Sequence, residues 1–147
     1  MIPKMRAVKL DAVKAQCNCL ALRRAARQVA RRYDEALKPL ELSNGQFSIL
    51  AALGQMEMAG TQRIGDLLGM DRTTVTAALK PLQRRDLVEQ VASEADLRTR
   101  SVRLTRAGRR LLDQALPLWA QVQSSVEAEL GGARSAAQVR TQLLGIV

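Results

Sequence analysis

Apolar residues between positions 61 and 82 recur at intervals of three and four, in two short runs separated by a glycine. The apolar positions of the first run are Ile64, Leu67 and Leu68. Thr61 stands where a helix favours a capping residue, and Gly69 follows where a helix end favours a left-handed residue. The pattern therefore predicts a first short helix that Thr61 caps and Gly69 ends.

A second helix is predicted directly after this turn, with Asp71 as its N-cap. Its core-facing stripe consists of Val75, Ala78, Leu79 and Leu82. The opposite face carries hydroxyls, cations and a small side chain, namely Arg72, Thr73, Thr76, Ala77 and Lys80. Arginine pairs bidentately with guanine, threonine offers a hydroxyl and a methyl group, and alanine allows close approach to a groove floor. The two helices therefore indicate a helix-turn-helix, with double-stranded DNA as the expected partner.

Pro81 lies inside this second helix. Proline has no N–H group, so the hydrogen bond to the carbonyl of Ala77 is lost, and the ring crowds that carbonyl. We expect a kink or an interruption at Pro81, which leaves base reading mainly to residues 72–77.

Two strand-like segments follow, over residues 87–91 and 101–105. In the second, apolar and polar residues alternate, so one face can pack on the helices while the other meets water. The polar stretch between them carries Asp96, Arg98 and Arg100. A β-hairpin directly after a recognition helix forms a wing, whose cationic tip can enter a minor groove. Asp96 is expected to pair with one of the two arginines and to stabilise the tip.

The flanking segments have long apolar stripes of their own. The stripe before the lobe consists of Cys19, Leu22, Ala26, Val29, Tyr33, Leu37 and Leu40. The stripe after it consists of Leu111, Leu112, Ala115, Leu118, Trp119, Val122, Val126 and Leu130. Pro39 and a capping box at Ser43 and Gln46 end the first helix and start another. Pro117 is expected to kink the later helix and Gly131 to end it, before a final helix over about 135–144.

These stripes expose more apolar surface than one small lobe can cover. We predict a mainly α fold in one domain over residues 1–147, with a winged helix-turn-helix lobe at 43–109 that includes a small β-hairpin. Residues 8–40 and 110–147 are assigned to dimerisation helices. The recognition helices of a homodimer would then lie about one DNA turn apart, ~34 Å.

Composition and charge support this fold. Hydrophobic residues make up 47% of the chain, which excludes a mainly disordered protein, and aromatic residues only 2%. A core of Leu, Val, Ile and Ala suits packed helices. The net charge is +9, with the cations concentrated in residues 1–40 and 71–110. Positive charge localised around the helix-turn-helix and wing indicates phosphate binding that weakens steeply as salt rises.

Several classes of function find no support in the sequence. The chain has no histidine, and neither a paired acid and base nor a glycine-rich phosphate loop can be assembled, so we predict no enzyme and no cofactor. Cys17 and Cys19 alone cannot form a metal site. No segment approaches the ~20 apolar residues of a membrane span, and the N-terminus lacks a secretory core. A cytoplasmic protein without membrane attachment is expected.

The order of these motifs resembles the MarR family of winged-helix transcriptional regulators. The resemblance is carried by residues 46–53, 67–76, 82–88 and 96–108. It implies a homodimer on a palindromic operator and a small aromatic or phenolic effector bound between the dimerisation and DNA-binding regions, in a ligand-responsive repressor. The candidate DNA-binding residues are Arg72, Thr73, Thr74, Thr76, Ala77, Lys80, Arg84, Arg98 and Arg100. The sequence names no residues for the effector pocket.

Asp86 departs from the family pattern, because it stands where the family usually has glycine, just past the recognition helix. A left-handed residue costs Asp more than Gly, although Asp tolerates this conformation better than most residues. We therefore expect a slightly strained turn at Asp86.

The two cysteines have two interpretations. Cys19 falls on the apolar stripe and is expected to be an inert buried thiol, with Cys17 about 160° round the same helix. Cys19 and Tyr33 are also similar in spacing to the peroxide-sensing cysteine and a tyrosine of the OhrR branch of the family. Where that branch has a second tyrosine, this chain has Arg23. Redox sensing through Cys19 therefore stays open beside ordinary packing.

Two other kinds of binding protein also stay open, because winged helices serve more than one purpose. A protein-interaction module should show no salt-sensitive binding to duplex DNA. An architectural DNA-binding protein should bind scrambled DNA nearly as well as an operator.

Overall fold

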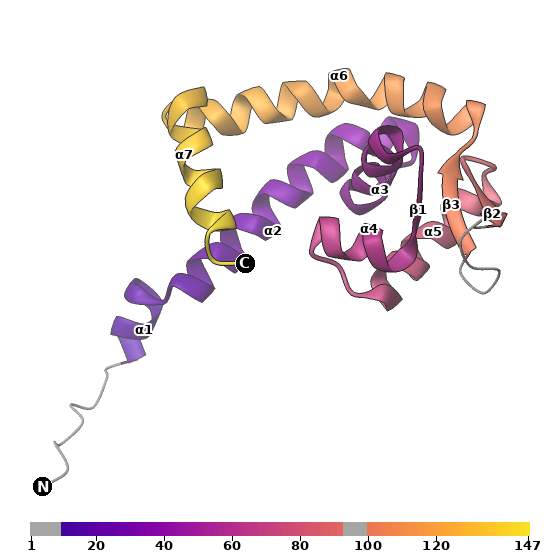
Figure 1. Cartoon of the computed structure of the whole chain (residues 1–147). Helices are drawn as coiled ribbons and strands as arrows, with labels where there is room; N and C mark the ends of the chain where they lie inside the picture. Colours follow the sequence, from indigo (N-terminus) through magenta and orange to yellow (C-terminus); the bar gives the residue numbers. More distant parts are fainter. Residues whose placement is uncertain (1–9, 93–99) are drawn as a thin grey trace, which may run out of the picture.

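Two long helices project from a winged lobe in the computed structural model, which describes residues 10–92 and 100–147 (Figure 1). Helices α2 (Asn18–Leu37) and α6 (Arg106–Glu129) pack against each other near the lobe, and both extend beyond it. The shorter terminal helices are α1 (Leu10–Gln16) and α7 (Ala133–Leu144). Helix α7 turns back from the far end of α6 toward α2. No helix in these described ranges is long and apolar enough to cross a membrane.

The helix-turn-helix forms as predicted. Helix α4 (Thr61–Leu68) ends at Gly69, whose φ of 63° is left-handed, and α5 (Arg72–Arg84) starts after the N-cap Asp71. The prediction that Thr61 caps α4 is wrong by one residue, because Gly60 is the N-cap and Thr61 is the first helical residue. Gly60 also ends a β-strand, and this extended backbone sets the start of the helix.

Helix α5 runs past Pro81 to Arg84, so the predicted interruption at Pro81 is wrong. The missing N–H removes one hydrogen bond, but the last turn is held by other contacts. Leu82 is completely buried, and the backbone N–H of Arg85 donates to the Pro81 carbonyl over 3.2 Å. The exposed face of α5 therefore continues beyond residues 72–77.

The wing belongs to a three-stranded antiparallel sheet in the order β1-β3-β2. Strands β2 (Val88–Ala92) and β3 (Arg100–Leu104) form the predicted hairpin, each within one residue of the expected bounds. Strand β1 (Met58–Gly60) was not predicted, because three residues are too short to show alternation. It pairs with the far side of β3, with Ala59 opposite Val102. The wing tip, including Asp96 and Arg98, lies outside the described residues.

The core fills the lobe between the helices and the sheet. Its largest fully buried side chains are Leu37, Ile49, Leu50, Leu53, Ile64, Val75 and Leu82, so aliphatic residues dominate as predicted. Helix α3 (Asn44–Met56) crosses the centre and starts at the predicted capping box of Ser43 and Gln46. A short 3-10 helix, η1 (Lys38–Leu40), links it to α2.

Polar contacts that the sequence did not predict join α2 to α6, and α6 to α7. The buried Tyr33 donates its hydroxyl proton to Gln123 over 2.7 Å, and Arg32 forms an ion pair with Glu129. Arg140 of α7 reaches Glu127 of α6 over 3.1 Å. These partners are up to 97 residues apart in sequence, so periodicity within one segment could not reveal them.

The expectation for the cysteines is wrong in two respects. Cys17 is not on the same helix as Cys19, because it is the N-cap of α2, where its Sγ accepts the Leu20 backbone N–H over 3.4 Å. Cys19 is exposed rather than buried in the single chain. The reason is that the first half of α2 projects beyond the lobe, so its apolar stripe has no core to face.

The turn after α5 is left-handed as predicted, with a φ of 53° at Asp86. Its carbonyl accepts the Thr105 hydroxyl over 2.6 Å, a backbone contact that glycine would keep. We expect Asp86→Gly to raise the free energy of unfolding by about 0.5–1 kcal/mol, because relief of left-handed strain exceeds the added chain entropy of glycine. Denaturant unfolding measures this change. A less stable variant would show that the carboxylate itself stabilises the turn.

Candidate nucleic-acid interface

The exposed face of α5 is the most distinctive surface of the lobe. Five predicted side chains from it line one shallow hollow of about 280 Å³, namely Arg72, Thr73, Thr76, Ala77 and Lys80. Val75 and Leu79 on the opposite face are buried, which holds the helix in this orientation. The structure thus divides α5 into the two faces that the sequence predicts, and the contact of the outer face with DNA stays a prediction.

The start of α5 is stabilised by Asp71 and Thr74. One Asp71 oxygen accepts the Thr74 backbone N–H and the other its hydroxyl, both over 2.8 Å. These hydrogen bonds hold the pKa of the Asp71 carboxyl below its ordinary value. Thr74 was a candidate DNA ligand, but its hydroxyl donates to the cap and its side chain does not line the hollow.

This cap makes the stability of α5 depend on pH. The folded-state pKa of Asp71 is lowered from 3.8, so its charge stabilises the fold above that pH, and the contribution is lost as pH falls through the lowered value. Asn can still cap a helix but carries no charge. We expect Asp71→Asn to be less stable than the wild type at pH 7, with the difference shrinking below about pH 4. Urea unfolding at several pH values measures this, and a difference independent of pH would contradict it.

A second concave surface lies between the start of α4, the outer face of α5 and the sheet. Its volume is about 490 Å³, and its cationic lining residues are Arg72, Lys80 and Arg100. Its amide-bearing lining residues are Gln62, Gln83 and Gln90. Sequence reasoning missed these glutamines, although Gln83 stands three residues after Lys80 and thus on the same helical face. Amides both donate and accept hydrogen bonds, so they can pair with base edges and can donate to phosphate oxygens.

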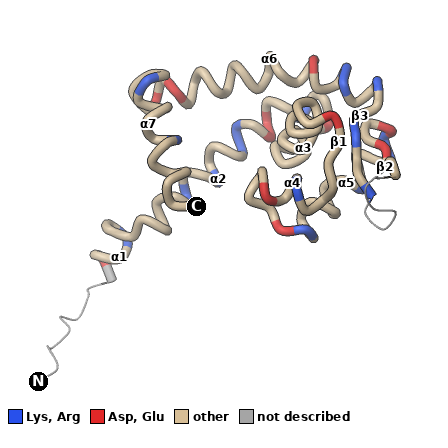
Figure 2. The backbone as a smooth tube through the Cα atoms, in the orientation of Figure 1, with Lys and Arg blue, Asp and Glu red and all other residues tan. Residues whose placement is uncertain are grey.

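Two exposed arginines of β3 are held against β2. Arg100 donates to Gln90 over 3.0 Å, and Arg103 forms an ion pair with Glu89 over 2.8 Å. Figure 2 shows the Lys and Arg positions of β3 and the first turns of α6 at the lobe end of the molecule. Arg84 is exposed but lines neither concave surface, so it lies apart from the main group of candidates.

An open apolar pocket of about 360 Å³, called the cavity below, lies between the lobe and α6. Its apolar lining residues are Phe47, Ala51, Ala52, Leu67, Leu68, Leu116 and Trp119, and its polar ones are Ser48 and Gln55. The rings of Phe47 and Trp119 stack with centroids 6.3 Å apart. Two of the three aromatic residues of the chain thus meet at one cavity, a signal that the sequence contains but that periodicity does not connect.

The sequence matches the profile of the MarR family over residues 42–99. The M. tuberculosis transcriptional regulator MosR, crystallised in complex with DNA, is 38% identical. The similarity covers 87% of this chain and 93% of MosR, with a TM-score of 0.76.

Two further relatives agree with this match. The transcriptional repressor CouR, bound to a DNA duplex, is 27% identical over 96% of this chain and 99% of CouR, with a TM-score of 0.81. The organic hydroperoxide resistance transcriptional regulator of Bacillus subtilis is 27% identical over 75% of this chain and 76% of that protein. The winged lobe, the projecting helices and these similarities together show that the chain belongs to the MarR family of transcriptional regulators.

Proposed function

We propose that this protein is a sequence-specific DNA-binding repressor that acts as a homodimer on a palindromic operator. The observation that carries the proposal is the outer face of α5, where Arg72, Thr73, Thr76, Ala77 and Lys80 line one hollow beside a cationic sheet. Similarity to MosR and CouR, both crystallised with DNA, supports the same function. The protein acts by binding rather than by catalysis.

The arrangement of the lobe suggests how the duplex is read. Helix α5 enters the major groove, which admits an α-helix, and its first residues meet the base edges. Arg100 at the start of β3 follows the neighbouring minor groove. The sequence-based expectation that Arg98 joins it there and that Asp96 pairs with an arginine belongs to the same proposal. Arg84 at the end of α5 contacts phosphate. The glutamines of the second concave surface add hydrogen bonds to bases or backbone.

The projecting helices provide the dimer interface. Apart from Leu116, which lines the cavity beside Trp119, the large apolar side chains left exposed on them in the single chain are Val13, Leu22, Leu130, Leu143 and Leu144. A second copy that packs its own α1, α2, α6 and α7 against them would remove this apolar surface from water. We therefore propose residues 43–109 as the DNA-binding lobe and the segments 8–40 and 110–147 as the dimerisation region.

We propose the cavity beside Phe47 and Trp119 as the site of a small aromatic or phenolic effector. Its walls are apolar and aromatic, and Ser48 and Gln55 offer hydrogen bonds that would orient a phenol or carboxylate. It lies between the lobe and α6, so an occupant would alter how the lobe sits on the dimerisation region. A ligand that binds the DNA-incompetent arrangement more tightly would release the operator.

A thiol switch at Cys19 is a second candidate trigger, favoured by the exposure of Cys19 and by similarity to the hydroperoxide resistance regulator. The thiolate would attack the peroxide, giving a sulfenic acid at Cys19 and releasing the alcohol after protonation. Cumene hydroperoxide should then release DNA from the wild type and from Cys17→Ser but not from Cys19→Ser. Release from all three would exclude Cys19 as the sensor.

The proposed function is tested by selecting duplexes from a random pool and titrating the best one by fluorescence anisotropy. We expect tight binding to the selected duplex, much weaker binding to a scrambled one, and a steep loss of affinity with salt. Equal binding to both duplexes would indicate an architectural protein. The absence of salt-sensitive binding to any duplex would indicate a protein-interaction module.

A further inference from the structure

Arg85 directly follows the last residue of α5 and is half-buried, whereas its charged neighbours Arg84 and Asp86 are exposed. Its guanidinium donates to two successive backbone carbonyls, that of Glu41 over 2.7 Å and that of Leu40 over 3.0 Å. It forms no ion pair with a carboxylate in the part of the chain that the structure describes. The Arg85 side chain therefore connects the end of α5 to a backbone segment more than 40 residues earlier, and it does so through hydrogen bonds to carbonyls.

These two carbonyls lie at the junction where α2 passes through η1 into α3. Glu41 is left-handed with a φ of 52°, and it turns the chain at the end of η1. The last carbonyls of a helix lack partners within it and favour a cation. The planar guanidinium meets two of them at once, which the single ammonium of a lysine cannot do in the same way.

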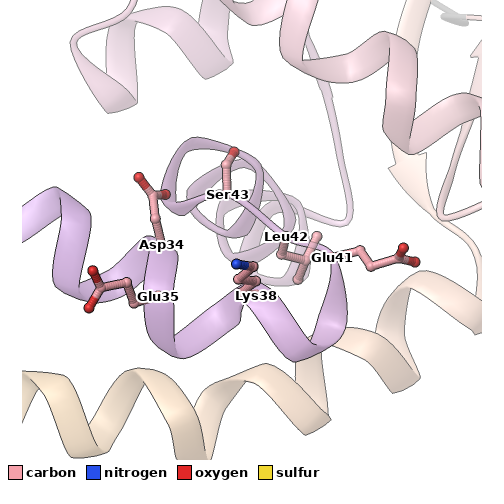
Figure 3. A pocket seen from close by; sticks show the side chains of 6 residues that line it. All are labelled: Asp34, Glu35, Lys38, Glu41, Leu42 and Ser43. Atoms are coloured by element: carbon pink, nitrogen blue, oxygen red, sulfur yellow. The ribbon is translucent and has the colours of Figure 1, made fainter.

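A further hydrogen bond and a buried side chain also stabilise this junction. Figure 3 shows Asp34, Lys38, Glu41 and Ser43 around a hollow of about 570 Å³. The Asp34 carboxylate accepts the backbone N–H of Asn44 over 2.7 Å at the start of α3. Leu42 is buried, which holds the chain between η1 and α3 in the core.

We infer that Arg85 is a positioning residue, which ties the end of α5 to the end of η1, the link between α2 and α3, and so sets the angle at which the lobe presents α5 to DNA. The inference rests on the proposed function, in which α5 reads DNA and α2 belongs to the dimerisation region. A change in the position of α2 would then reach α5 through two hydrogen bonds to Arg85, without passing through the core.

The experiment compares the wild type with Arg85→Met, Arg85→Lys and the matched control Arg84→Met, all as full chains. Affinity for a selected duplex and for its scrambled version is measured across a salt series. We expect Arg85→Met to weaken specific binding roughly 2- to 30-fold, with little change on scrambled DNA. Arg85→Lys can keep one hydrogen bond, so its affinity for the selected duplex should lie between those of Arg85→Met and the wild type. Arg84→Met should weaken binding to both duplexes alike. It should also reduce the slope of the logarithm of affinity against the logarithm of salt concentration by about 0.9 in magnitude, as loss of one phosphate contact does.

Two outcomes would overturn the inference. Unchanged affinity of Arg85→Met for the selected duplex would show that the hydrogen bonds of Arg85 do not position α5. An equal loss of affinity for both duplexes, with a smaller salt slope, would show that Arg85 is a phosphate ligand. Hydrogen exchange without DNA separates this failure from that of the proposed function. We expect Arg85→Met to speed exchange of the Leu42 and Leu87 amides together. Unchanged exchange at both amides would contradict the claim that Arg85 connects the end of α5 to the end of η1. If exchange changes as expected but the wild type prefers no duplex, the proposed function fails and Arg85 has no DNA role.

Discussion

Replacing Gly108 by alanine should lower the free energy of unfolding by about 3 kcal/mol or more, the largest loss we expect from a single added methyl group. Gly108 lies in the first turn of α6, directly over the start of the hairpin. A Cβ atom there would overlap with the carbonyl oxygen of Leu87. That oxygen belongs to the backbone and accepts the N–H of Thr105 over 3.1 Å, so it cannot move aside as a flexible side chain would.

Chemical denaturation of Gly108→Ala beside Gly60→Ala measures this effect. Gly60 is the matched control, because a Cβ there would meet nothing within 4 Å and its backbone is extended in a way that alanine adopts. We expect the control to change stability by no more than about 1 kcal/mol, the usual cost of a poorer N-cap. Equal losses in the two variants would show that contact with Leu87 does not determine the position of α6.

Replacing Arg72 by alanine should weaken binding to a selected duplex by about 1–3 kcal/mol, or roughly 5- to 150-fold. Arg72 is the first residue of α5, and its side chain lines both concave surfaces of the lobe. At the start of a recognition helix, an arginine can reach guanine bidentately, so the loss should be concentrated at particular base pairs.

Arg110→Ala is the matched control for net charge. Arg110 is also exposed, but it lies on α6 and lines neither concave surface. Anisotropy titrations against single-base variants of the selected duplex should show a loss for Arg72→Ala that differs between positions and a small uniform loss for Arg110→Ala. Uniform losses of the same size in both variants would mean that Arg72 contributes charge and no base recognition.

Local patterns predicted the parts of this molecule that local interactions form. Helices α4 and α5 follow from apolar spacing, from Gly69 and from the Asp71 cap, and the left-handed turn falls at Asp86 as expected. The bounds of both hairpin strands were predicted to within one residue, because strand-like residues fill both segments and those of the second alternate between apolar and polar. In each of these cases, the residues that determine the structure lie within about one helical turn or one strand of each other.

Features that depend on distant partners could not be predicted in this way. Strand β1 is stabilised by pairing with β3, more than forty residues later in the chain. Helix α5 continues past Pro81 because Leu82 is packed in the core, a tertiary effect that outweighs the local cost of proline. The candidate site shows the same division, since the outer face of α5 was expected, whereas Gln62 and Gln90 join it only through the fold.

The contrast between Cys19 and Tyr33 illustrates why an apolar stripe alone does not indicate burial. Both residues lie on α2, yet Tyr33 is 8% exposed and packs against the core, whereas Cys19 is exposed. The apolar stripe of α2 runs beyond the lobe, and in the proposed dimer a second copy would cover its outer half. Within one chain, Cys19 and Tyr33 are 14 residues apart, or ~21 Å along the axis of α2. A tyrosine could therefore approach Cys19 only if it were Tyr33 of the second copy in the proposed dimer.

The central claim, that two copies of this chain read one palindrome, is tested most directly by the mass of the complex with the selected duplex. Sedimentation equilibrium should give two chains per duplex, and the selected sequences should contain inverted half-sites with centres about 10 base pairs apart or a multiple of that spacing. One chain per duplex, or selected sequences without two-fold symmetry, would contradict the account.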